Sequence, residues 1–136
     1  MQNNKNIVIL KLFLTGLFLS LAALSNAGMD TLTHHYSYSF AAEYKWDRQF
    51  WDPAISWKNK YIEGDPAKQK VQMSLLIFSI NKPSFLTDGW HLLKAIMLAF
   101  IFLSSVVWIP VNWWKKLLIF IGILLLWSIV FEIAYR

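Results

Sequence analysis

Three long stretches of the chain are almost entirely apolar. They cover about residues 7–27, 90–109 and 117–135, and the charged side chains inside them are Lys11, Lys94 and Glu132. A helix needs roughly 20 apolar residues to cross a hydrocarbon core about 30 Å thick, because it rises about 1.5 Å per residue. The pattern therefore predicts an all-α membrane protein, a single membrane domain over residues 1–136 with three transmembrane helices.

Two further patterns qualify this picture. The apolar stretch 71–80 is only about ten residues long and is followed by Lys82 and Pro83, so we interpret it as interfacial or re-entrant. The first span has an alternative interpretation, since lysines precede a leucine-rich run that ends in Ser25-Asn26-Ala27, as in a cleaved signal peptide. We favour a retained helix; cleavage would leave two spans.

The lysines near the span ends predict an orientation. Lys5 and Lys11 flank the first span, and Lys115 and Lys116 lie in the turn between the second and third. Lysine and arginine concentrate on the cytoplasmic side, so these ends are expected there. The last two spans then form an antiparallel hairpin, with residues 28–87 on the extracytoplasmic side of a bacterial inner (cytoplasmic) membrane and the N-terminus in the cytoplasm.

Residues 28–87 are rich in aromatic rings. Tyr36, Phe40 and Tyr44 recur at four-residue spacing, which predicts a helix lying along the membrane surface. The alternation Tyr-Ser-Tyr-Ser-Phe fits a short strand instead. We expect an aromatic-rich interfacial segment with short helices. The turns Asp52-Pro53 and Gly64-Asp65-Pro66 bracket a compact unit within it, residues 55–63.

Composition agrees with a membrane protein and narrows its chemistry. The chain is 57% hydrophobic, 17% aromatic and 15% charged, and it contains no cysteine. The absence of cysteine excludes disulfides, thiolate catalysis and cysteine-based metal sites. The formal charge of +5 is dispersed, which favours anionic lipid head groups over nucleic acid. No phosphate-binding glycine loop, G-x-S-x-G elbow or H-E-x-x-H motif is present, so no standard soluble enzyme class is indicated.

Carboxylates and imidazoles at the outer ends of the spans predict a metal site. Asp30 and His34 are four residues apart and Asp88 and His91 are three apart, so each pair shares one helix face. Together these residues offer the nitrogen and oxygen ligands of zinc or another divalent metal, which could activate water against a lipid or a membrane-anchored substrate. Alternative or supporting groups are His35, Glu132 and Lys94.

The same residues allow simpler interpretations. Thr87 or Asp88 could cap the second helix, with His91 an interfacial polar residue. Haem ligation by His34 or His35 together with His91 ranks below the metal site, since the nearby carboxylates fit haem poorly. Lys94, one turn inside its span, could pair with Glu132 or extend its ammonium outward to the head groups.

Three motifs resemble an uncharacterised family of small bacterial integral membrane proteins with the pattern W-x-N-K-[YW], G-D-P and L-T-D-[GA]-W-H. The matching residues are Trp57-Lys58-Asn59-Lys60-Tyr61, Gly64-Asp65-Pro66 and Leu86-Thr87-Asp88-Gly89-Trp90-His91, within about residues 50–110. Val71-Gln72-Met73-Ser74 departs from the proline-glycine-serine segment expected before Leu75. The resemblance implies a membrane location and no chemistry. It also marks a polar cluster, made of Lys58, Asn59, Lys60, Tyr61 and Asp65. This cluster is either a lipid head-group contact, through Lys58, Asn59, Lys60 and Tyr61, or a folded polar cap.

The sequence thus leaves several functions open. One is a metal-dependent membrane protein acting at the outer interface, and another is a haem-binding membrane protein. A third is a non-enzymatic membrane subunit, lipid-binding scaffold or assembly factor with a membrane protein partner or a second copy of itself. A pore is the weakest, because neither hairpin span carries a polar stripe.

Overall fold

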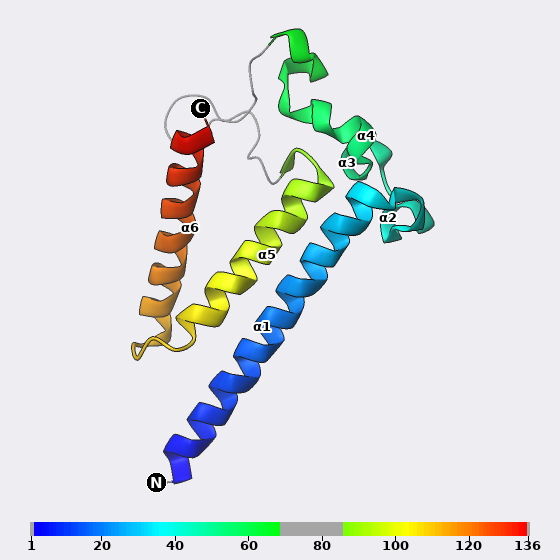
Figure 1. Ribbon diagram of the computed structural model, residues 1–136. Helices are drawn as coiled ribbons and strands as arrows, with labels where there is room; N and C mark the ends of the chain where they lie inside the picture. The colour runs from blue at the N-terminus through cyan, green and yellow to red at the C-terminus, as the bar shows by residue number, and fades with distance from the viewer. Residues whose placement is uncertain (1, 69–85, 136) are drawn as a thin grey trace. The chain divides into compact units, whose positions relative to one another are not determined.

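The computed structural model describes residues 2–68 and 86–135 (Figure 1), and the side chains of residues 4–68 and 86–131. These ranges contain helices and turns and no strand. Three helices are long and apolar enough to cross a membrane: α1 (Gln2–His34), α5 (Gly89–Val106) and α6 (Trp113–Tyr135). The predicted all-α class with three candidate spans is therefore confirmed. The stretch 71–80, predicted to be interfacial or re-entrant, lies outside the described residues.

The helix ends differ from the predicted span ends for local reasons. Helix α1 has 33 residues and continues through His34, well past the predicted exit at residue 27. Helix α5 stops at Val106, before Pro110, which cannot donate a helical hydrogen bond. Because α6 already begins at Trp113, Lys116 lies in its first turn, and the Lys116 ammonium donates to the Val107 carbonyl at 2.6 Å. This bond satisfies one of the acceptors left open at the end of α5.

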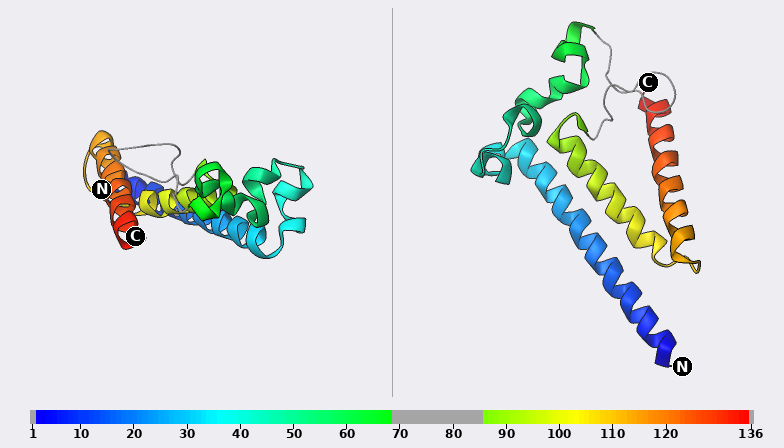
Figure 2. Two further views of the ribbon diagram at one scale, coloured as in Figure 1. Left: turned by 90° about the horizontal axis from the view of Figure 1, so that it is seen from above. Right: turned by 180° about the vertical axis from the view of Figure 1, so that it is seen from behind.

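Short helices follow one another from the end of α1 (Figure 2). The predicted continuous helix across Tyr36, Phe40 and Tyr44 is interrupted, because Ser39 has extended backbone angles and its hydroxyl accepts from the Ala42 N–H at 3.2 Å. Such a cap starts a new helix. The elements are η1 (Tyr36–Tyr38), α2 (Phe40–Glu43), α3 (Arg48–Trp51), α4 (Pro53–Ser56), η2 (Trp57–Lys60), η3 (Ile62–Gly64) and η4 (Pro66–Lys68).

The chain divides into two compact units. The cap unit is Ser25–Ile96, and the hairpin unit is Met1–Leu24 with Met97–Arg136. In the cap unit Phe40, Trp46 and Trp51 form an aromatic cluster, with ring centroids 4.9 to 5.4 Å apart. Edge-on and tilted ring contacts of this kind add to the burial of apolar area.

In the hairpin unit aromatic side chains join the helices. The rings of Phe18 and Phe100 stack at 6.1 Å, and the Trp108 indole N–H donates to the Thr15 hydroxyl at 2.8 Å. Most apolar side chains of α6 are exposed, as expected of a helix that has lipid for its solvent.

Candidate functional site at the start of helix α5

Asp88 caps helix α5 and holds the imidazole of His91. One carboxylate oxygen, Oδ1, accepts from the His91 backbone N–H at 2.9 Å. The other, Oδ2, lies 2.7 Å from His91 Nδ1 and accepts from the Thr87 hydroxyl at 3.1 Å. Asp88 is only 3% exposed. The sequence predicted both the cap and the shared helix face, and both are confirmed.

Two opposing effects act on the pKa of Asp88. Burial raises the pKa, while hydrogen bonds from the His91 imidazole, the His91 backbone N–H and the Thr87 hydroxyl lower it, with a net result below the ordinary value. Asp88 is therefore ionised at neutral pH. With Asp88 charged, His91 Nδ1 is the donor to it, which fixes the imidazole tautomer.

We expect this carboxylate to make the cap unit acid-sensitive. A carboxyl group with a depressed folded-state pKa stabilises the fold above its unfolded pKa of about 3.9, and this contribution is lost as pH falls through the folded value. Tryptophan fluorescence and circular dichroism of the detergent-solubilised protein should change in an acid titration below about pH 4. Asp88→Asn keeps a capping oxygen but cannot titrate, so an unchanged acid transition in this variant would contradict the assignment.

Asn59 ties two distant segments together. Its Nδ2 donates to the Gln49 carbonyl at 2.7 Å and to the Thr87 carbonyl, 28 residues later, at 2.8 Å. Its Oδ1 accepts from Gln49 Nε2 at 2.5 Å. The asparagine of the W-x-N-K-Y motif thus connects α3 to the residue before the Asp88 cap. Its spacing along the chain contained no signal for these partners.

Gly89 lies against the ring of Trp51. A Cβ atom at Gly89 would be 2.3 Å from Trp51 Cε3 and 2.8 Å from Cζ3, closer than real Cβ atoms come. The glycine of the L-T-D-G-W-H motif therefore lets the start of α5 approach the aromatic cluster. Neither Gly89 nor Trp51 was predicted to belong to the site, because their contact joins distant parts of the chain.

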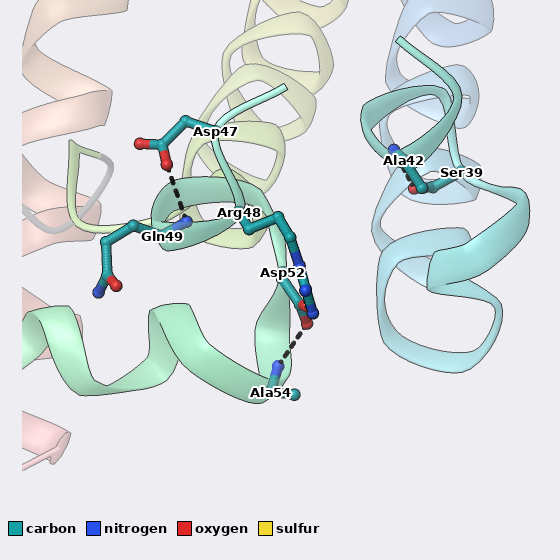
Figure 3. Close-up of polar contacts among 7 residues, drawn as sticks. All are labelled: Ser39, Ala42, Asp47, Arg48, Gln49, Asp52 and Ala54. Atoms are coloured by element: carbon teal, nitrogen blue, oxygen red, sulfur yellow. Dashed lines mark hydrogen bonds and ion pairs between the residues drawn. The ribbon is translucent and has the colours of Figure 1, made fainter. Parts of the chain in front are cut away.

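Further polar side chains start the short helices (Figure 3). The Asp47 carboxylate accepts from the Gln49 N–H at 2.9 Å and begins α3, and Asp52 accepts from the Ala54 N–H at 3.1 Å and begins α4. Asp52 is 4% exposed and also accepts from the Arg48 guanidinium at 2.6 Å. The predicted turn at Asp52-Pro53 is therefore a cap shared between two helices.

The predicted metal ligands do not gather into a metal site. Asp30, His34 and His35 are exposed at the end of α1, whereas Asp88 and His91 bond to each other. Among residues 4–68 and 86–131, no group of three or more histidines, aspartates or glutamates could hold a metal ion. The described residues thus give no support to the four-ligand site, and none to haem.

The remaining predicted residues have local partners or lie outside the described part. The Lys94 ammonium lies 4.9 Å from the centroid of the Trp90 ring, one turn nearer the start of α5. The side chain of Glu132 is outside the described residues, so its pairing with Lys94 stays a prediction.

Two lysines of η2 lie beside aromatic rings, near a pocket. Lys58 Nζ lies 5.8 Å from the Trp57 ring centroid, and Lys60 Nζ lies 5.3 Å from that of Tyr61. A pocket of about 290 Å³ is lined by Asp47, Gln49, Phe50, Asn59, Tyr61, Glu63, Gly64, Leu86 and Thr87. The lining offers amide, hydroxyl and carboxylate groups but no imidazole.

Comparisons with protein-family models, curated proteins and solved structures find no match for the chain. Its three long apolar helices are compatible with a small membrane protein.

Proposed function

We propose that the protein is a non-enzymatic, lipid-binding membrane scaffold whose short helices, from η1 to η4, lie on the bilayer surface. The observation that supports this best is how the polar side chains of the cap unit are used. Asp88 is occupied in capping α5 and holding the His91 imidazole, and Asn59 is occupied in joining α3 to the residue before that cap. A general acid, base or metal ligand would need such groups turned toward a substrate.

The exposed side chains of the cap unit suit the lipid head-group region. Tyr38 is 85% exposed and Tyr44 68%, and Trp46 and Trp57 are exposed as well. Tyrosine and tryptophan combine an apolar ring with a polar tip, so they favour the boundary between hydrocarbon and water. The ammonium groups of Lys58 and Lys60, beside their rings, would attract anionic lipid phosphates.

The pocket beside η2 favours binding over catalysis. His91, the imidazole that Asp88 orients, does not line it. Its walls include Asn59 and Thr87, which already hydrogen-bond each other. A neutral hydroxyl group of a lipid head group is a suitable occupant, because the described lining residues include the carboxylates of Asp47 and Glu63 and no basic side chain, and the scaffold function requires no reaction there.

A depth measurement tests the proposal. The chain has no cysteine, so one introduced thiol can be labelled uniquely. Tyr38→Cys and Trp57→Cys, each carrying a fluorophore and placed in nanodiscs, should be quenched by lipids brominated near the top of the acyl chain. Ala67→Cys, an exposed position between charged Glu63 and Lys68, is the control and should be quenched by aqueous iodide instead.

The same variants test the side of the membrane. In intact cells, a membrane-impermeant thiol reagent should reach Ala67→Cys but not Asn112→Cys in the turn before α6. In the depth measurement, equal quenching by iodide of the labels at Tyr38, Trp57 and Ala67 would overturn the proposal that the short helices lie on the bilayer surface.

A further inference from the structure

The hairpin unit contains an apolar groove with two lysines among its lining residues. Its volume is about 420 Å³, and most of its wall is aliphatic or aromatic. The start of α1, the end of α5 and the start of α6 contribute the wall, with Leu14, Phe18 and Phe120 among the apolar side chains. Lys11 and Lys116 are the cations of this lining. The groove is therefore amphipathic.

Both ammonium groups are held in place. Lys116 Nζ donates to the Val107 carbonyl at 2.6 Å, and an ammonium has three donors, so two are left for a ligand. Lys11 Nζ lies 5.8 Å from the centroid of the Trp108 ring. The indole N–H of that ring bonds the Thr15 hydroxyl at 2.8 Å, one turn further along α1.

No carboxylate neutralises these cations within the described part of the hairpin unit. Residues 1–24 and 97–131 contain no aspartate or glutamate, but they contain Lys5, Lys11, Lys115 and Lys116. Helix α6 also begins here, and the N-terminal end of a helix favours negative charge. The charge of the groove is complementary to an anion.

We propose that this groove binds one anionic phospholipid, with its phosphate at Lys11 and Lys116 and an acyl chain along the apolar wall. The apolar wall contributes nothing to the binding of a free inorganic phosphate. A phospholipid offers its phosphate to the lysines and an acyl chain to the apolar wall. A second copy of the chain is disfavoured, because its own groove would bring lysines against lysines. The site shares no residue with the cap unit, so it stands or fails separately from the proposed surface contact.

Lipid retention measures the proposal directly. The full-length protein is purified in mild detergent from vesicles of equal phosphatidylglycerol and phosphatidylcholine, and the lipid that stays bound is weighed by native mass spectrometry. Each lysine near a head group contributes about a fivefold preference, so two predict roughly a 30-fold preference for phosphatidylglycerol. Lys11→Gln/Lys116→Gln should abolish it.

Lys115→Gln is the matched control. It removes the same charge one residue away, but Lys115 lies over the Trp114 ring and does not line the groove. We expect its preference to change less than about fivefold. Equal losses in the control and the double variant would overturn the proposal, as would a wild-type protein that retains both lipids alike or a dimer in place of a lipid adduct.

A second variant separates lipid binding from the cap that Lys116 gives α5. Leu14→Trp fills the apolar wall and leaves both lysines in place, so it should lose the retained lipid while circular dichroism stays helical. Full retention in Leu14→Trp would show that the acyl chain lies elsewhere and would overturn the proposal.

Discussion

Gly89→Ala is expected to destabilise the cap unit by about 2–3 kcal/mol, although alanine is ordinarily the better helix former. The added Cβ would be 2.3 Å from the Trp51 ring, and that ring is itself packed against Phe40, Trp46 and Phe50. Either Trp51 leaves the cluster or the start of α5 moves away, with loss of the bonds around Asp88. In both cases packing at the start of α5 is lost.

A buried thiol measures this cost without a denaturant. Ser56 is 3% exposed in the cap unit, and a Ser56→Cys reporter would be the sole cysteine. Its labelling rate reports how often the unit opens, and 2–3 kcal/mol corresponds to an increase of roughly 30- to 150-fold.

Gly122→Ala in α6 is the matched control for this experiment. A Cβ there would meet nothing within 4 Å, so labelling should stay unchanged. Equal labelling rates in the two glycine variants would contradict the close packing of Gly89 on Trp51.

Asn59→Asp is the second change with a large expected effect. The substitution preserves shape but turns the donating Nδ2 into a carboxylate oxygen, which then faces the carbonyls of Gln49 and Thr87 at 2.7 and 2.8 Å. Losing both donors beside two acceptors should cost about 2–4 kcal/mol. The Ser56→Cys labelling rate should rise roughly 30- to 900-fold.

Asn112→Asp provides the comparison for that variant. Asn112 is exposed in the turn before α6, where aspartate caps a helix as well as asparagine does. If both substitutions left the labelling rate unchanged, Asn59 would not connect α3 to the start of α5 in solution.

The spans could be predicted from sequence because hydropathy adds up over some 20 residues. The presence of short helices could be predicted, but the residues at which they begin and end could not. Their bounds depend on single caps such as Ser39 and Asp52, and the four-residue spacing of rings from Tyr36 to Tyr44 misled the prediction toward one continuous helix.

The site was predictable where its contacts are local. Asp88 and His91 are three residues apart, so helix geometry alone brings them together. The contacts of Asn59 with Thr87 and of Trp51 with Gly89 depend on how the short helices pack, for which no periodicity exists. The metal hypothesis gains no support, because among the described residues Asp30 and His34 form no metal-binding group with Asp88 and His91.

The unequal lengths of the spanning helices have a consequence for the bilayer. Helix α1, with 33 residues, is about 50 Å long, whereas α5, with 18, is about 27 Å long. A helix longer than the hydrocarbon thickness adapts by tilting, whereas a shorter one requires the surrounding lipid to thin. In thicker, sterol-rich or long-chain lipid mixtures the hydrophobic mismatch is therefore expected to fall on α5, whereas α1 can become less tilted.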